Sequence, residues 1–165
     1  MRFKTVLCIW IAVVLCAAAV AAQSDSVLID RLVASVNDNA ITLSELREKH
    51  EAMKKNMPSI TEAEALQSMI NAQLLLEKAR QMRIEGKTPD ELIASYIDLK
   101  IRASIVVPED AINRYYAENR EKLGGTDYRQ VRDEIENYLT EQETNRLLKE
   151  HIARLRAAAD IMILP

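Results

Sequence analysis

The side chains best able to do chemistry in this sequence are two cysteines and two histidines. Cys8 and Cys16 fall within the first 22 residues, whereas His50 and His151 stand far apart in the chain. Both histidines are surrounded by charged residues, so we interpret them as solvated side chains on helix surfaces. A catalytic or metal-binding histidine would need partners that can gather around it.

Other catalytic patterns are also missing from the sequence. Three glycines are too few for a glycine-rich phosphate loop, and no serine stands in a nucleophile elbow. Several glutamates fall in first turns or on exposed faces of predicted helices, where a negative charge is favourable; they are Glu45, Glu51, Glu62 and Glu64. The residues therefore predict no enzyme, no cofactor and no metal site.

The first 22 residues have the three parts of a secretion signal. Residues 1–4 are positively charged, residues 6–18 are apolar, and residues 17–22 are small. Signal peptidase requires small side chains at the first and third positions before the cut. We therefore expect export, with cleavage after Ala21 or Ala22.

Two other interpretations of this segment are possible. A lipoprotein signal needs a small residue before its cysteine, but Leu15 precedes Cys16. An uncleaved membrane anchor is the second alternative, because the apolar stretch is at the lower limit for crossing a bilayer. In that case alone the chain would be attached to a membrane.

Cleavage would change the composition of the working protein. Loss of Arg2 and Lys4 reduces the 22 basic residues to 20, against 25 acidic ones, for a net charge of −5. Both cysteines would leave as well, so residues 23–165 could form no disulfide. An acidic chain without a concentrated basic patch is not expected to bind nucleic acid.

The mature segment opens and closes with strand patterns. Apolar residues alternate between Leu32 and Val36, a period of two that favours a strand. We expect a tight turn at Asp38–Asn39 and a return strand over 40–43. Because a two-stranded hairpin alone is unstable, the apolar run 161–164 is predicted to be its third strand.

Helix signals fill the region between these strands. Capping boxes open two helices at Thr42 and Thr61, and Thr88 with Pro89 opens a third. The predicted helices cover residues 44–57, 61–83, 88–105, 111–119 and 126–159. The fold class is therefore mainly α, with a small antiparallel sheet formed by an N-terminal β-hairpin and a C-terminal strand, and with a long C-terminal helix.

Four segments of the sequence match one family in order. The opening Asp30-Arg31-Leu32-Val33-Ala34-Ser35-Val36-Asn37-Asp38 continues to Leu46, and an apolar helix spans residues 68–76. A Val-Pro-Glu-Asp-Ala-Ile-Asn-Arg-Tyr-Tyr helix begins at Val107, and a long helix with a strand ends the chain. These segments resemble the SurA-type periplasmic chaperones, and the resemblance covers residues 23–165 as one N-terminal-like chaperone domain.

The sequence departs from that family at one place. In relatives with isomerase activity, a parvulin domain separates the Tyr-Tyr helix from the last helix, whereas here residues 123–127 join the two helices directly. The chain thus resembles a SurA-like domain that lacks the prolyl isomerase. The resemblance implies residence in the periplasm and passive, ATP-independent binding of unfolded clients, above all outer-membrane proteins.

Flexible thioether, aromatic and aliphatic side chains suit variable apolar clients. Because two adjacent tyrosines cannot both be buried on one helix face, at least one is expected to be exposed; Met69 and Met82 are expected in the core. The candidate client-binding residues are Met53, Met57, Ile101, Ile105, Tyr115 and Tyr116. The alternatives are an assembly subunit of the same fold with one dedicated partner, and a prolyl isomerase.

Overall fold

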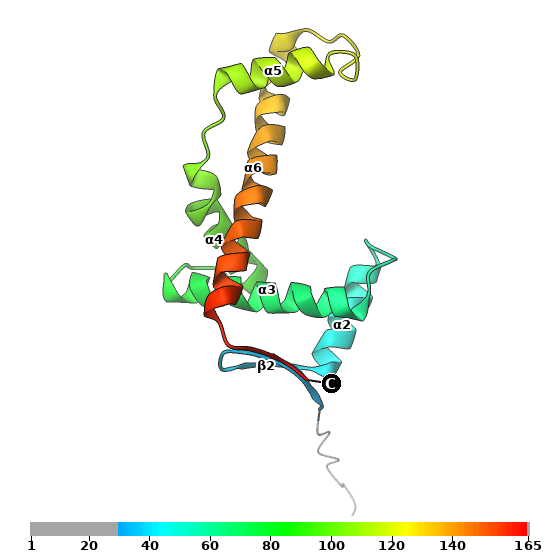
Figure 1. The fold of residues 1–165 in the computed structure, drawn as a ribbon, viewed down its shortest axis with the longest axis vertical. Coiled ribbons are helices and arrows are strands. Elements are labelled where there is room, and N and C mark those ends of the chain that lie inside the picture. Colours follow the sequence, from blue (N-terminus) through cyan, green and yellow to red (C-terminus); the bar gives the residue numbers. More distant parts are fainter. Residues whose placement is uncertain (1–29, 165) are drawn as a thin grey trace, which may run out of the picture.

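The computed structural model describes residues 30–164, so the predicted secretion signal with Cys8 and Cys16 lies outside the described residues. Figure 1 shows a sheet and two helices at one end of the molecule, and a long helix that leads away from them. The element order is β1 Leu32–Val36, β2 Asn39–Thr42, α2 Leu43–Lys54, α3 Glu62–Gln81, α4 Pro89–Lys100, a 3-10 turn η1 Arg102–Ser104, α5 Glu109–Asn119, α6 Tyr128–Ala158 and β3 Ile161–Ile163.

The predicted hairpin is confirmed, but its turn lies one residue earlier than expected. Val36 pairs with Asn39, so the loop consists of Asn37 and Asp38. Asn37 has a φ of 50°, a left-handed conformation that asparagine adopts more readily than most residues. Its side chain also accepts a hydrogen bond from the Asp160 backbone N–H at 3.0 Å. Asn37 therefore has two roles: its backbone forms the hairpin turn, and its side chain holds the residue that precedes the C-terminal strand.

The third strand is also confirmed. β3 pairs antiparallel with β1, with Ser35 opposite Met162, and the strand order is β2-β1-β3. The ladder extends past the strand at both ends through Leu164 N–H to Val33 O and Asn37 N–H to Asp160 O, at 2.9 and 2.7 Å. The two ends of the described chain are thus joined in one sheet.

The sheet packs against α2 and α3 to form the first of three apolar clusters, which we call the base cluster. Both predicted capping boxes are present at the helix starts: the side chains of Thr42 and Thr61 accept from the backbone of Glu45 and Glu64, whose carboxylates bind back to the cap residues. The buried members of the base cluster are Val33, Ala34, Val36, Ile41, Leu46, Ala65, Leu66, Ile70 and Leu74.

A second group, the middle cluster, joins the end of α3 to α4 and to the C-terminal half of α6. Its buried members are Leu75, Ala79 and Tyr96, and α6 contributes Leu148, Ile152 and Leu155 from the side. Arg156 of α6 reinforces this junction, because its guanidinium donates to Asn71 and Gln67 of α3, each at 2.7 Å. α4 ends earlier than predicted, at Lys100, and residues 102–104 form the separate 3-10 turn.

The third group, the tip cluster, lies at the other end of α6. Ile112 of α5 and Val131 and Ile135 of α6 are its buried members. Gly124 and Gly125 connect the two helices with φ values of 63° and 70°, which glycine adopts without steric cost. This connection is the point where the resemblance would place a parvulin domain, and the chain passes directly from α5 to α6.

The molecule is elongated because α6 spans all three clusters. At 1.5 Å per residue, its 31 residues give a length of about 46 Å. Figure 1 shows α5 lying across the far end of α6, with the sheet, α2 and α3 at the near end. None of the helices between residues 30 and 164 has both the length and the hydrophobicity needed to cross a bilayer.

Candidate binding groove

The six residues predicted to bind clients do not form one surface. Met53 and Met57 lie at the end of α2, Ile101 and Ile105 flank the η1 turn, and the two tyrosines lie on α5. Ile101 contradicts the prediction, because only 4% of its side chain is exposed. It is the C-cap residue of α4, and its backbone N–H donates to the Ile97 carbonyl. Ile105, in contrast, is half-buried at a surface groove.

The expectation that one of the two adjacent tyrosines is exposed is wrong. Tyr115 and Tyr116 are both half-buried and pack against the tip cluster. They diverge around α5 and each meets a tyrosine of α6: Tyr115 contacts Tyr138 and Tyr116 contacts Tyr128, with ring centroids 5.2 and 5.3 Å apart. Two adjacent residues can both be covered here because α6 and the loop after α5 cover different sides of α5.

The exposure of the methionines differs from the prediction at two of the four positions, Met53 and Met82. Met57 is 48% exposed in the turn after α2, whereas Met53 packs against the base cluster. Met69 is partly buried against the base cluster, as expected for a core residue. Met82 was expected in the core but is 47% exposed, because α3 ends at Gln81 and Met82 turns away at its C-cap.

Neither histidine is a solvated surface residue. His50 is 7% exposed, and its Nε2 donates to the Ile60 carbonyl at 2.9 Å. His151 is half-buried on α6, and its Nε2 lies 2.7 Å from the hydroxyl of the buried Tyr96. His50 thus connects α2 to the loop before α3, and His151 connects α6 to α4. The charged residues next to each histidine in the sequence gave no indication of these contacts.

One surface hollow lies where the chain crosses from η1 to α5, and most of the residues that line it are apolar. It has a volume of about 360 Å³. The strand-like linker Ser104–Pro108 forms one wall, and α6 forms the other. Its lining residues are Ser104, Ile105, Val106, Val107, Pro108, Ala111, Leu139, Glu143 and Leu147. We call it the linker groove.

Local sequence explains why the linker leaves a groove instead of a packed helix. Pro108 disfavours helical geometry at Val107, and two successive β-branched residues precede that position. Val106 is 86% exposed, the highest value among the exposed large apolar residues of the described chain. Ile105 and Val107, its neighbours, are half-buried. The alternation places an apolar side chain at the rim of the groove, in contact with solvent.

Sequence reasoning missed the other groove residues. Leu139 and Leu147 fall within the predicted helix 126–159 and Val106 falls between two predicted helices, but no sequence pattern singled out any of the three. An available signal was the uninterrupted apolar run Ile105–Val107, which no turn residue or charge breaks. The pairing of this run with Leu139 depends on how α5 folds back on α6, and no local pattern in the sequence encodes that contact.

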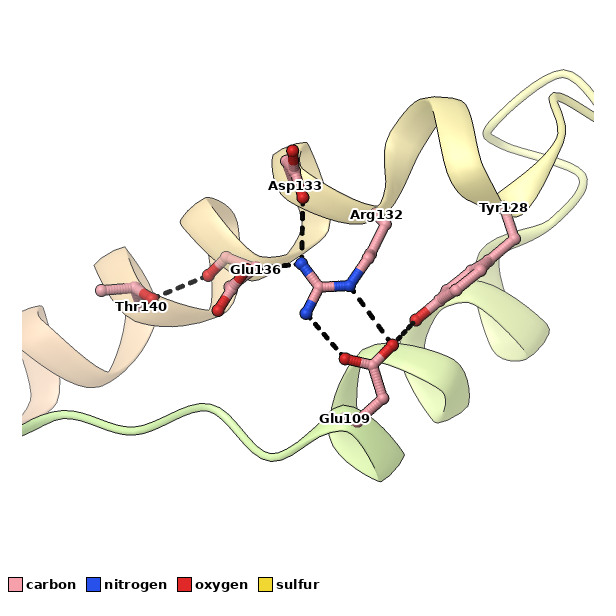
Figure 2. A network of polar contacts seen from close by, with 6 residues as sticks. All are labelled: Glu109, Tyr128, Arg132, Asp133, Glu136 and Thr140. Carbon is pink, nitrogen blue, oxygen red and sulfur yellow. Dashed lines mark hydrogen bonds and ion pairs between the residues drawn. The ribbon is translucent and has the colours of Figure 1, made fainter.

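A polar network holds the far end of the groove together (Figure 2). Arg132 of α6 binds the Glu109 carboxylate at the start of α5, with its Nη2 2.7 Å from Oε2 and its Nε 3.3 Å from Oε1. Asp133 and Glu136 bind the same guanidinium at 2.9 and 2.8 Å, and the Tyr128 hydroxyl donates to Glu109. These contacts lower the pKa of Glu109, first through Arg132 and then through Tyr128. The network fixes α5 on α6 and with it the direction of the linker.

Two further hollows lie closer to the base. One, of about 350 Å³, lies between the hairpin, α2 and α3 and is lined in part by Glu45, Glu48 and Lys49. The other, of about 350 Å³, lies below the hairpin turn and includes Asp38, Glu77 and Lys78. Both have more charged walls than the linker groove, whose only charged lining residue is Glu143.

No group of three or more histidine, cysteine, aspartate or glutamate side chains within residues 30–164 could hold a metal ion. No protein-family model matches the chain, and no curated protein matches it significantly. The linker groove is therefore the candidate functional site on geometry alone.

Proposed function

We propose that this protein is an ATP-independent chaperone that binds unfolded polypeptide segments, with outer-membrane proteins as the expected clients. The linker groove is its binding surface. The observation that carries the proposal is Val106, an 86% exposed apolar side chain at the rim of a groove whose lining residues are mainly apolar. A groove lined by several apolar side chains, with a further one exposed at its rim, forms a continuous apolar surface of the kind that binds other macromolecules.

The shape of the site supports loose binding of variable partners. The groove is open, and its linker wall is joined to the rest of the molecule by the polar network at Glu109 and by the η1 turn. Apolar contact without fixed hydrogen-bond partners allows many sequences to bind weakly. Such binding needs no nucleotide, which agrees with the periplasmic location expected from the sequence.

The motif order from Asp30 to Leu164 supports the same proposal. The segments that resemble SurA-type chaperones form the sheet, the α3 core, α5 and the α6–β3 ending. An assembly subunit with one dedicated partner is the alternative that the same groove allows. A prolyl isomerase is the third proposal from the sequence, and a proline-peptide isomerisation assay with the purified protein would separate it from the other two.

The proposal is tested by aggregation assays with several unrelated unfolded proteins. The variant Val106→Asp places a charge at the rim of the groove, where it disturbs little of the folded core. The matched control is Met82→Asp, at an exposed apolar residue that caps the C-terminal end of α3. Circular dichroism melts of both variants confirm that they fold.

We expect the wild type and Met82→Asp to suppress aggregation of all clients equally. Val106→Asp should need about tenfold more protein for the same effect, because the buried area of one valine is worth about 1.5 kcal/mol. Suppression of none of the clients by the wild type would contradict the chaperone function. Equal loss in both variants would contradict the assignment to the linker groove.

A further inference from the structure

We infer that the linker groove selects unfolded segments in which apolar residues stand beside lysine or arginine. This inference rests on the proposed function and names the class of client. Two observations support it. Acidic and apolar side chains alternate along one face of α6, and carboxylates outnumber the arginines that pair with them around the groove. Both observations concern described residues and are independent of the exposure of Val106.

The α6 wall of the groove alternates between acidic and apolar side chains. Residues spaced three or four apart on a helix lie on the same face, and this spacing joins one stripe that runs past the linker. The stripe consists of Glu136, Leu139, Glu143, Leu147 and Glu150. Its three central members line the groove. A client in the groove therefore meets leucine side chains with a carboxylate between them.

The carboxylates outnumber the arginines that pair with them. Arg146 binds both Glu143 and Glu150, each at 2.6 Å. These contacts lower the pKa of Glu143, with the side-chain bond from Arg146 as the largest cause. Glu143 therefore remains charged at neutral pH, and two glutamates share a single arginine, which leaves this group with a formal net negative charge. The side chain of Glu143 is still 39% exposed, so it remains accessible to a client.

The same imbalance occurs at the two ends of the groove. Arg132 binds three carboxylates at the α5 end, as Figure 2 shows. Arg102, just before the linker, binds both Asp98 and Glu141, at 3.0 and 2.6 Å. Each arginine is thus already shared between two or more acids. Residues 104–108 carry no charge of their own, so the groove is apolar at its linker wall and negative along its α6 wall.

This distribution complements one kind of polypeptide segment. Apolar side chains can pack against the linker and the two leucines, while lysine or arginine side chains approach the partly exposed carboxylates of Glu136, Glu143 and Glu150 along the stripe. An acidic client segment would meet like charges at every one of these positions. Charge complementarity of this kind sets specificity and the association rate more than total affinity, which suits a passive binder.

The inference is tested with three short fluorescein-labelled peptides and fluorescence anisotropy. Each peptide contains leucines in the same number, combined with lysine in the first, serine in the second and glutamate in the third. At low salt we expect the lysine peptide to bind roughly tenfold more tightly than the glutamate peptide, with the serine peptide between them. The difference should shrink at high salt, because the charges are exposed.

Two matched triple variants locate the effect. Glu136→Gln, Glu143→Gln and Glu150→Gln together remove the acids of the stripe. Glu48→Gln, Glu85→Gln and Glu118→Gln change the net charge equally at exposed positions on other elements. The stripe variant should lose the preference for the lysine peptide, so that its affinities for the three peptides converge. The control variant should behave as the wild type.

Each result decides between distinct conclusions. Equal binding of all three peptides by the wild type overturns the charge preference and leaves the chaperone proposal standing. Loss of the preference in the control variant, or its retention in a folded stripe variant, overturns the assignment to α6. Binding of no peptide, together with no suppression of aggregation, overturns both proposals. The peptide comparison in the wild type remains decisive even where a variant does not fold.

Discussion

At the scale of single residues, the burial of His151 and the cations around it make the stability of the fold depend on pH. Burial lowers its pKa below the ordinary value of 6.5, and nearby cations from three helices lower it further. These cations are Arg154, Lys100 and Lys78. Because the folded state disfavours the imidazolium, the unfolded chain binds a proton at this residue first as the pH falls. The stability that neutral His151 provides is present above about pH 6.5 and decreases below it.

His151→Gln should therefore flatten the pH dependence of stability. Glutamine can still accept the hydrogen bond from the Tyr96 hydroxyl but does not titrate. We expect the wild type to lose more of its melting temperature than the variant when the pH falls from about 7.5 to about 5.5. The measurement is a series of thermal melts at fixed ionic strength. Parallel curves for the two proteins would contradict this role of His151.

Ile112 tests the tip cluster at the same scale. Its side chain is fully buried between α5 and α6. Ile112→Ala should cost about 3 kcal/mol, because it removes apolar contacts and leaves a cavity. The loss should be concentrated at the tip, so hydrogen exchange should accelerate in residues 109–119 more than in α3. Ala117→Ser, at an exposed position of α5, is the control and should leave exchange unchanged.

At the scale of elements, local signals predicted where helices start, but they predicted the ends of α2 and α4 less well and tertiary contacts poorly. The capping boxes at Thr42 and Thr61 and the cap at Thr88 are confirmed because a cap depends on residues within one turn. The burial of Ile101, the exposure of Met82 and the covering of both α5 tyrosines depend on residues far away in the sequence. No periodicity reports such contacts, and the linker groove was missed for the same reason.

The N-cap of α3 tests directly whether residues within one turn determine where a helix starts. Thr61→Ala removes the hydroxyl that accepts from the Glu64 backbone at 3.2 Å. We expect a loss of about 1 kcal/mol in the free energy of unfolding, measured by urea denaturation. Ser59→Ala, an exposed change two positions earlier, should have no effect. A loss of the same size in both variants would show that the cap itself is not responsible.

Strand β3 tests the contribution of a contact between residues far apart in the sequence, its pairing with β1. Deletion of residues 160–165 removes β3 and leaves the β1 edge unpaired, so the melting temperature of the whole base should fall markedly. Met162→Thr is the control, because it changes an exposed side chain and keeps the backbone pairing with Ser35. An unchanged melting temperature after the deletion would contradict the contribution of the β1–β3 pairing to stability.

At the scale of the whole molecule, three small clusters in series replace one large core. The base and middle clusters share Leu155 of α6, whereas the tip cluster draws only on α5, α6 and the adjoining linker and loop. The span of α6 between the two ends is only partly covered, and the linker groove lies along it. An elongated shape of this kind offers surface at the expense of burial, which agrees with a protein that binds unfolded chains.

The central claim is that clients bind at the linker groove, and site-specific crosslinking tests it most directly. A photoreactive amino acid is placed at Val106 and, in a second protein, at Met82, and each is illuminated with several unrelated unfolded proteins. We expect crosslinks to every client from position 106 and few from position 82. Crosslinks to one partner alone would indicate the assembly subunit, and equal crosslinking from both positions, or none from position 106, would contradict the groove as the binding site.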